Sequence, residues 1–158
     1  MIRDWLFADE SNICGFRAAG VLIRDNELLL QSHGNEFALP GGHVVLGETA
    51  EDAIIREFKE EIRLDILCAK LLWIEESFWN WGSKKAHSIS FYYLTSLKDG
   101  SDISGNFLET SKDNKDVLFQ WASLEDLGKI AVYPSFVKYE IKNISGDIKH
   151  FVTNTWEN

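Results

Sequence analysis

One helix with glutamates gathered along one side constrains this chain more than any other feature. Thr49 to Ile62 is the clearest helical pattern, and Thr49 with Asp52 three residues later resembles the capping box that begins many helices. At about 100° per residue, one arc of this helix is apolar and faces a core: Ile54, Ile55, Phe58 and Ile62. Glutamates fill the neighbouring arc, at positions 57, 60 and 61. The chain must therefore bury one face of the helix while three carboxylates line its edge.

The crowding of Glu57, Glu60 and Glu61 needs a physical reason, because like charges three or four positions apart repel by about 0.2–0.5 kcal/mol per pair. On the helical projection Arg56 falls with Lys59 on the solvent side, opposite the core. Arg56 precedes Glu60 by one turn and can pair with one carboxylate, but not with three. A hard divalent cation relieves the crowding, since Mg²⁺ takes carboxylate oxygens together with phosphate oxygens and water. A solvated acidic face is the alternative explanation.

The segment before the helix, LPGGHVVLGE, favours the cation. Gly41 and Gly42 allow the backbone to approach a ligand closely. Pro40 and the two glycines are expected to interrupt regular structure, so this segment is predicted to be irregular. Glu48 adds a fourth glutamate directly before the helix. The glycines, this glutamate and the capped helix form one compact unit.

From Gly42 to Leu64 the sequence resembles the Nudix box. The box reads G, five of any residue, E, seven of any, R, E, an aliphatic or aromatic residue, any, E, E, any, G and an aliphatic residue. Gly42, Glu48 and the run REFKEEIRL that starts at Arg56 follow this pattern at every fixed position except Arg63, where the family has glycine. Similarity to the Nudix layout extends to Arg17-Ala18-Ala19, Leu39-Pro40-Gly41-Gly42, and a Trp121 strand followed by LEDL.

This resemblance implies a fold and an activity. The fold is an α/β (α+β) domain, the Nudix α/β/α sandwich, with a mixed β-sheet between helices. It is expected as a single domain over residues 1–158, with the box at 42–64. The activity is a pyrophosphohydrolase reaction on a nucleoside diphosphate linked to another group X, with Mg²⁺ or Mn²⁺ as the cofactor.

Carried over by position, the resemblance also assigns site residues. The metal ligands would be Glu57, Glu60 and Glu61, helped by the main-chain carbonyl of Gly41 or Gly42. Arg56 and Glu48 match the buttressing pair that orients the helix and its loop. Glu57 is in addition a candidate general base.

Candidate substrate contacts lie outside the helix. Trp81, beside Gly82 and two lysines, is expected to be an exposed ring on which a nucleobase could stack for about 1–3 kcal/mol, although such rings also pack in cores. His43 directly follows Gly42, and Arg17 lies on the first strand, so both are candidates to face the substrate. A further acid is expected from the polar loop before Val117, with Glu109 as first choice over the aspartates there.

The remaining elements are assigned from periodicity and turn signals. Strands are predicted over 16–25 and 28–33 as a hairpin, then over 66–78, 86–97, 117–123 and 148–155. Helices are predicted near 124–129 and over 135–143, and residues 98–116 are predicted to be rich in loops. Mixed strands and helices indicate a layered α/β domain.

Net charge and cysteine content limit the classes of partner and the compartment that we expect for this protein. The formal charge of −9 argues against polymeric nucleic acid, but not against a small phosphorylated ligand, because a cation can reverse the local field. No segment is apolar for long enough to cross a bilayer, and MIRDWLFADE does not resemble a signal peptide. Cys14 and Cys68 are far apart and are expected to be buried thiols in a reducing cytoplasm. A small-molecule nucleotide or other diphosphate is the expected partner, without a membrane, and the resemblance leaves room for a homodimer.

Two other functions are compatible with the same fold. One is a catalytically silent Nudix-fold domain that binds a nucleotide such as ADP-ribose for regulation. The other is chemistry like that of isopentenyl-diphosphate isomerase, which needs a catalytic cysteine, and neither Cys14 nor Cys68 lies near the box. The complete set of box carboxylates favours hydrolysis. The sequence does not choose among oxidised nucleotides, ADP-ribose, dinucleotides, sugar nucleotides and non-nucleotide diphosphates.

Arg63 raises a narrower question about the end of the helix. A left-handed residue, usually glycine, commonly closes a helix. An arginine in that conformation costs about 1–2 kcal/mol. We therefore expect a strained helix end with the glutamate edge intact.

Overall fold

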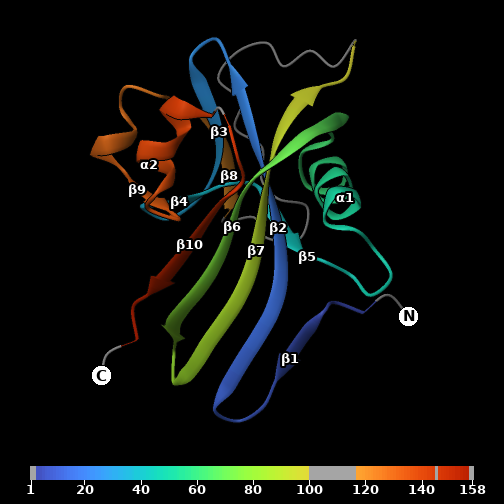
Figure 1. Ribbon diagram of the computed structural model, residues 1–158, viewed down its shortest axis with the longest axis vertical. Coiled ribbons are helices and arrows are strands. Elements are labelled where there is room, and N and C mark those ends of the chain that lie inside the picture. Colours follow the sequence, from blue (N-terminus) through green and yellow to red (C-terminus); the bar gives the residue numbers. More distant parts are fainter. Residues whose placement is uncertain (1–2, 100–116, 145, 157–158) are drawn as a thin grey trace.

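A strongly curved mixed sheet forms the body of the protein (Figure 1). The computed structural model describes residues 3–99, 117–144 and 146–156. The strands are β1 (Leu6–Ala8), β2 (Asn12–Arg24), β3 (Glu27–His33), β4 (Glu36–Ala38), β5 (Gly41–His43), β6 (Ile66–Trp81), β7 (Lys84–Leu97), β8 (Val117–Ser123), β9 (Ala131–Tyr133) and β10 (Lys149–Asn154). Their order is β10-β6-β7-β2-β3-β4-β9, with β1 and β5 also paired to β2 and β8 paired to β3.

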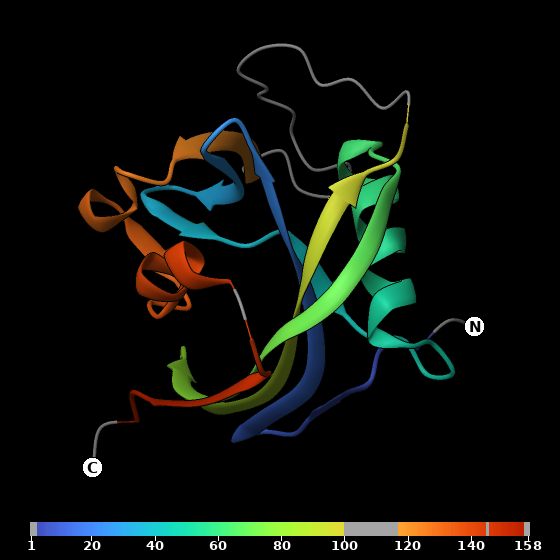
Figure 2. The same cartoon turned by 45° about the horizontal axis from the view of Figure 1, so that its top comes forward.

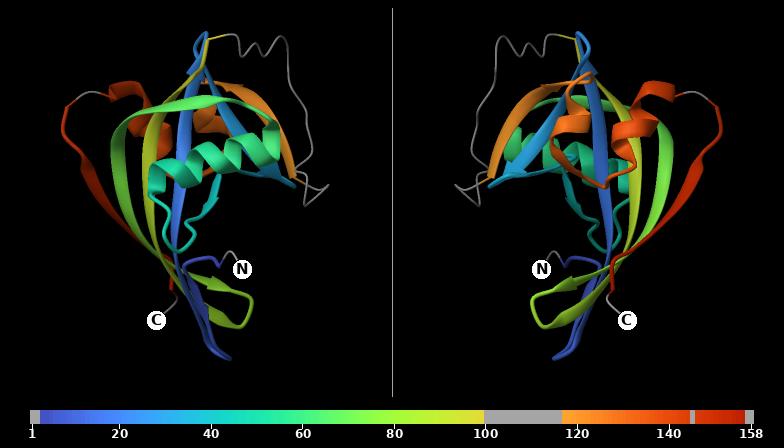
Figure 3. Two further views of the ribbon diagram at one scale, coloured as in Figure 1. Left: turned by 90° about the vertical axis from the view of Figure 1, so that its right-hand side faces the viewer. Right: turned by 90° about the vertical axis from the view of Figure 1, so that its left-hand side faces the viewer.

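Helices cover the sheet on two sides (Figures 2 and 3). Helix α1 (Ala50–Ile62) packs on one side, and α2 (Val137–Glu140), followed by the 3-10 turn η2 (Ile141–Asn143), lies on the other. A further 3-10 turn, η1 (Leu127–Lys129), precedes β9. The expected arrangement, a mixed sheet between helices, is therefore confirmed.

Successive residues of the central strands fill two separate cores, because side chains alternate across a sheet. Leu22 and Leu29 lie in the cluster that packs under α1 with Phe58. Val21 and Leu28 lie in the cluster on the α2 side. Burial on both faces explains why these strands read as continuous apolar runs.

Most predicted elements are present. The β2–β3 hairpin turns at Asp25-Asn26, whose φ angles of 48° and 66° suit a tight hairpin turn. The helix, the strands after it and the short helical segment near 135–143 are also confirmed. The predicted loop over 98–116 lies almost wholly outside the described residues.

Short strands are where the predictions are wrong. The segment LPGGHVVLGE was expected to be irregular, yet Gly41–His43 forms β5 and pairs with Arg17–Ala19. The two glycines have a low strand propensity, so the sequence pattern does not indicate a strand. They nevertheless allow the close pairing, because a methyl group on Gly41 would lie 2.1 Å from the Ala18 carbonyl oxygen. Strands β1, β4 and β9 have three residues each, too few for a sequence pattern to predict them.

The cysteines also differ from the expectation of two buried thiols. Cys14 is exposed and Cys68 is half-buried. Burial raises the pKa of the Cys68 thiol to about 11, so it stays protonated at neutral pH. Within the described residues, no helix is long and apolar enough to cross a membrane.

Helix α1 begins and ends at residues that the sequence identifies. The Thr49 hydroxyl accepts a hydrogen bond from the Asp52 amide at 3.1 Å and donates one to the Asp52 carboxylate at 2.7 Å. Arg63 has φ 56° and ψ 30°, the left-handed conformation, and its amide donates to the Phe58 carbonyl oxygen. The strained helix end is thus confirmed.

Replacing Arg63 with glycine should stabilise the protein by about 1 kcal/mol, because glycine adopts the left-handed conformation without the Cβ penalty but loses more chain entropy on folding. Urea unfolding followed by circular dichroism measures the difference. Arg63→Ala, which removes the same charge but keeps a Cβ, is the matched control and should show no gain. A lower stability for Arg63→Gly than for Arg63→Ala would contradict this explanation.

Candidate functional site

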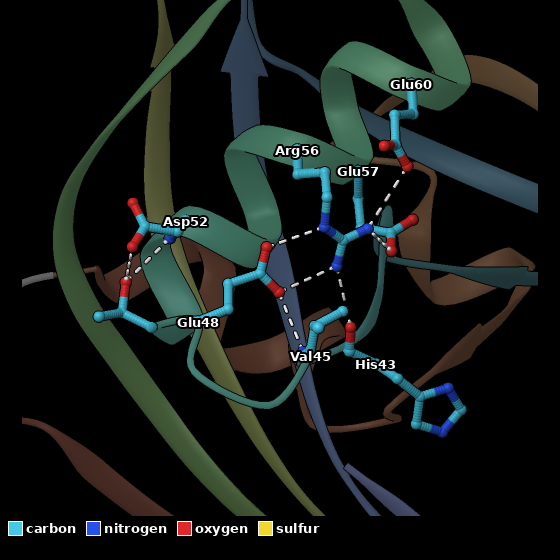
Figure 4. A network of polar contacts seen from close by, with 8 residues as sticks. His43, Val45, Glu48, Asp52, Arg56, Glu57 and Glu60 are labelled. Atoms are coloured by element: carbon cyan, nitrogen blue, oxygen red, sulfur yellow. Dashed lines mark hydrogen bonds and ion pairs between the residues drawn. The ribbon is translucent and has the colours of Figure 1, made fainter. Parts of the chain in front are cut away.

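The Arg56 guanidinium joins the helix to the loop before it (Figure 4). Nε donates to Glu48 Oε1 at 2.8 Å, and Nη2 donates to Glu48 Oε2 at 3.0 Å. Nη2 also donates to the main-chain carbonyl oxygen of His43 at 3.1 Å, while Glu48 Oε2 accepts from the Val45 amide at 3.0 Å. The two-pronged contact with Glu48 fixes both side chains in orientation as well as in distance.

The same guanidinium reaches two of the clustered glutamates. Nη1 donates to Glu57 Oε1 at 2.7 Å and lies 3.4 Å from Glu60 Oε2. Two predictions are therefore wrong: that Arg56 faces solvent, and that it pairs with only one of the clustered carboxylates. The helical projection places the Cα atom on that side, but the long side chain turns back over the helix surface, and only 25% of it is exposed.

These contacts shift the pKa values of the pair. The hydrogen bond with Arg56 holds the pKa of Glu48 below its usual range, against the effect of burial, and the Val45 amide adds to the lowering. The same hydrogen bond raises the pKa of Arg56 further. Both groups therefore stay charged across the neutral pH range.

Glu57 packs directly against the main chain of Gly42. A methyl group on Gly42 would lie 2.4 Å from Glu57 Oε1 and 2.5 Å from Cδ, closer than a side chain tolerates. Only 16% of the Glu57 side chain is exposed, whereas 58% of the Glu60 side chain is. Gly42 is therefore the residue that allows a carboxylate to sit between the helix and β5.

The donor set suits a hard cation at this edge. Glu57 and Glu60 bring carboxylate oxygens beside the backbone of Gly42, and Glu61 lies half-buried one position further along the helix. Over the described part of the chain no three acidic, histidine or cysteine side chains converge as a closed metal-binding group, and Glu57 and Glu60 contact Arg56 instead. Mg²⁺ suits such an open arrangement, because it binds one or two carboxylates and completes its shell with substrate oxygens and water.

Strand β5 separates this edge from a large cavity. Gly42 faces Glu57, whereas the next residue, His43, lines a cavity of about 1020 Å³ on the α2 side of the sheet. Arg17, paired with His43 across β2 and β5, lines the same cavity. Burial, with help from the Arg17 charge, lowers the pKa of His43, so its imidazole is neutral at pH 7. The volume suits a nucleotide-sized ligand.

The other predicted contact residues are more scattered. Trp81 lies at the end of β6, 61% exposed as expected, at the rim of the cavity. Glu109 lies outside the described residues. The structure thus brings together Glu48, Arg56, Glu57, Glu60 and Gly42 at one edge, and places Arg17, the His43 ring and Trp81 around the cavity.

The polar residues inside the cavity are not distinguished by any motif in the sequence. Glu75 and Tyr92 are 4% and 6% exposed and line it together with Ser88 and Ser90. One signal was available: Glu75 is two residues after Trp73 on a strand, and so shares the face of a large apolar residue.

Comparisons with known proteins identify the family. The NUDIX domain profile matches residues 16–140. An ADP-ribose pyrophosphatase from Methanocaldococcus jannaschii is 34% identical over 117 residues, which cover 71% of this chain and 63% of that protein, so the match spans less than two thirds of the relative's length.

Solved structures show the same fold. A NUDIX hydrolase from Nitrosomonas europaea has a TM-score of 0.64 at 12% identity, covering 94% of this chain and 82% of that one. An ADP-ribose pyrophosphatase from Streptococcus suis has a TM-score of 0.57 at 16% identity, covering 86% of this chain and 97% of that one. The profile covers most of the chain, and the shared fold agrees with it: the chain belongs to the Nudix family.

Proposed function

We propose that this protein is a divalent-metal-dependent hydrolase that cleaves a pyrophosphate linkage in a nucleoside diphosphate joined to a group X, with Mg²⁺ or Mn²⁺ as the cofactor. The observation that carries the proposal is the carboxylate edge of α1, where Glu57 packs against Gly42 and Glu60 lies one turn on. A cavity large enough for a nucleotide opens on the other side of β5. The complete set of box carboxylates favours hydrolysis over a binding domain without activity.

Glu57, Glu60 and Glu61 are proposed to hold the cation, with the Gly41 or Gly42 carbonyl as a further ligand. When bound, a divalent cation neutralises the diphosphate oxygens and favours loss of a proton from the attacking water. Glu57 is also the candidate base that accepts this proton. The water oxygen attacks one phosphorus atom, the bond to the bridging oxygen breaks, and a monophosphate product leaves.

Glu48 and Arg56 are proposed to act as positioning residues. Arg56 contacts Glu48 at two points and the His43 carbonyl at a third, so it fixes the loop relative to the helix. This holds Gly42 against Glu57. A displacement of about 1 Å at such a site is enough to cost a large factor in rate.

The relative from Methanocaldococcus jannaschii makes ADP-ribose the first compound to test. A panel of ADP-ribose, a sugar nucleotide, a dinucleotide, an oxidised nucleoside triphosphate and a non-nucleotide diphosphate should be incubated with Mg²⁺ and with Mn²⁺, and the phosphate products followed. Turnover of at least one compound that depends on the cation is expected. No turnover of any of them would contradict the proposed function.

Glu60→Gln and Glu61→Gln should each lower kcat/KM by about a hundredfold or more, because each removes a charge that holds the cation. Direct titration with Mn²⁺ should show weaker cation binding in the same variants. Glu51→Gln is the matched control, since Glu51 is an exposed acid on the first turn of the same helix. Near wild-type hydrolysis by Glu61→Gln at saturating Mg²⁺ would remove Glu61 from the ligand set.

Gly42→Ala should lower activity by about tenfold or more, because its methyl group would overlap the Glu57 carboxylate and move it. Gly128→Ala is the control, since a methyl group there meets nothing within 4 Å. Steady-state kinetics of both variants with one substrate and saturating Mg²⁺ provide the test. Equal activity of the two variants would show that the position of Glu57 is unimportant.

Glu48→Gln should lower the free energy of unfolding by about 1–3 kcal/mol at pH 7, because a charge-assisted hydrogen-bond pair is lost. The folded-state pKa of Glu48 lies below the ordinary value of 4.5, so its stabilisation is complete above pH 4.5 and disappears as the pH falls through the folded value. Unfolding of wild type and variant in urea at several pH values should show their difference shrinking below pH 4.5. A difference that stays constant down to pH 3 would contradict the role of the ionised Glu48 carboxylate in stabilising the fold. Glu10→Gln, at an exposed position, serves as the control.

A further inference from the structure

A buried carboxyl group lies inside the cavity, away from the glutamate edge. Glu75 is 4% exposed, and its Oε2 accepts a hydrogen bond from the Tyr92 hydroxyl at 2.6 Å. No lysine, arginine or histidine within the described ranges forms an ion pair with it. Burying a carboxyl group with one hydrogen-bond donor is costly, since its two oxygens accept several. A group retained at such a cost inside a cavity is a candidate to contact a ligand.

The strand register places Glu75 in a row that crosses the sheet. Glu75 on β6 pairs with Ser90 on β7, Ser90 pairs with Arg17 on β2, and Arg17 pairs with His43 on β5. Residues directly opposite each other point to the same face of a sheet. Neighbouring strands lie about 4.8 Å apart. Measured along the sheet, the Cα atom of Arg17 therefore lies roughly 10 Å from that of Glu75, and the Cα atom of His43 lies roughly 14 Å from that of Glu75. All four residues line the cavity.

The row carries a cation nearer its β5 end and a carboxyl group at its β6 end. At the β5 end, His43 is next to Gly42, against which Glu57 packs. On the next strand, Arg17 brings a guanidinium that forms no ion pair within the described residues, and its charge acts on both His43 and Tyr92. This end suits the phosphates of a substrate. The far end holds the Glu75 carboxyl group beside Tyr92. Burial and the nearby Glu75 raise the pKa of Tyr92, so its hydroxyl stays protonated and donates a hydrogen bond to Glu75. A carboxylate accepts hydrogen bonds from N–H and O–H groups and repels the negative charge of a phosphate.

We infer that Glu75, held by Tyr92, is a specificity-determining residue that accepts a hydrogen bond from an N–H or O–H group of the substrate, on the part that extends from the diphosphate across β2 and β7. This inference rests on the proposed function and adds the direction in which the substrate lies. Two parts of a nucleoside diphosphate derivative carry such donors: the amino group of a nucleobase and the hydroxyl groups of a sugar. A buried acceptor of this kind discriminates strongly, because an analogue without the donor leaves it unpaired.

The test compares three compounds in wild type, Glu75→Gln and Glu76→Gln. ADP-ribose is compared with IDP-ribose, in which the amino group of the base is replaced by an oxygen, and with an ADP alkyl ester, in which the second sugar is replaced. Glu76 is the matched control, because it is the neighbouring residue on β6 and pairs with His150 instead of lining the cavity. Near-UV circular dichroism and the melting temperature show whether each variant is folded.

Wild type and Glu76→Gln should prefer ADP-ribose over one of the two analogues by about ten- to a hundredfold in kcat/KM. Glu75→Gln should lose most of that preference, because an amide oxygen is a weaker acceptor than a carboxylate and the amide NH2 group cannot accept. A preference lost against IDP-ribose assigns the donor to the nucleobase, and one lost against the alkyl ester assigns it to the sugar. Tyr92→Phe keeps the ring but frees the Glu75 carboxyl group to rotate, so it should reduce the same ratio. It provides the test if Glu75→Gln does not fold.

The inference would be overturned if both ratios stay within twofold of wild type in folded Glu75→Gln and Tyr92→Phe. That result would leave the proposed function standing. A wild-type protein that hydrolyses none of the wider panel would contradict the proposed function, and this inference with it.

Discussion

The geometry of the site depends on one guanidinium. Arg56 contacts Glu48, the His43 carbonyl, Glu57 and Glu60, and so links the loop, β5 and two positions of α1. The contacts to Glu48 lie in a partly buried setting, where a two-pronged ion pair is held more firmly than on the surface. This link also opposes the mutual repulsion of Glu57 and Glu60, because it places a positive charge beside both carboxylates.

The sequence predicted the part of the site that local spacing determines. The capping box, the apolar arc and the glutamate arc all follow from the helical repeat, and Arg63 in the left-handed conformation follows from its position at the helix end. The direction of the Arg56 side chain did not follow, because a helical projection places Cα atoms and not the end of a flexible side chain. Strand β5 was missed because glycine, poor in strand propensity, is needed there for close pairing.

The cavity could not be predicted in the same way, because it depends on the register of strands that are distant in sequence. Arg17 was selected by its strand and His43 by its neighbour Gly42, but their alignment with Ser90 and Glu75 comes from pairings among four strands. A shift of one residue in any of these pairings would turn one side chain to the opposite face of the sheet. The fit of the β2 and β6 side chains into the two cores opposes such a shift, because it would exchange the residues that pack on each side of the sheet.

The order of the strands also bears on how the protein folds. The turn at Gly82-Ser83 joins β6 to β7 directly, so this hairpin closes a short loop. The parallel pairings of β2 with β7 and of β10 with β6 close much longer loops, whose entropy cost delays them. Arg17 and Glu75 therefore come together only after these slow, non-local pairings form. A ligand that contacts both strands would stabilise the pairings that have the least local support, so ligand binding and completion of the sheet are thermodynamically linked.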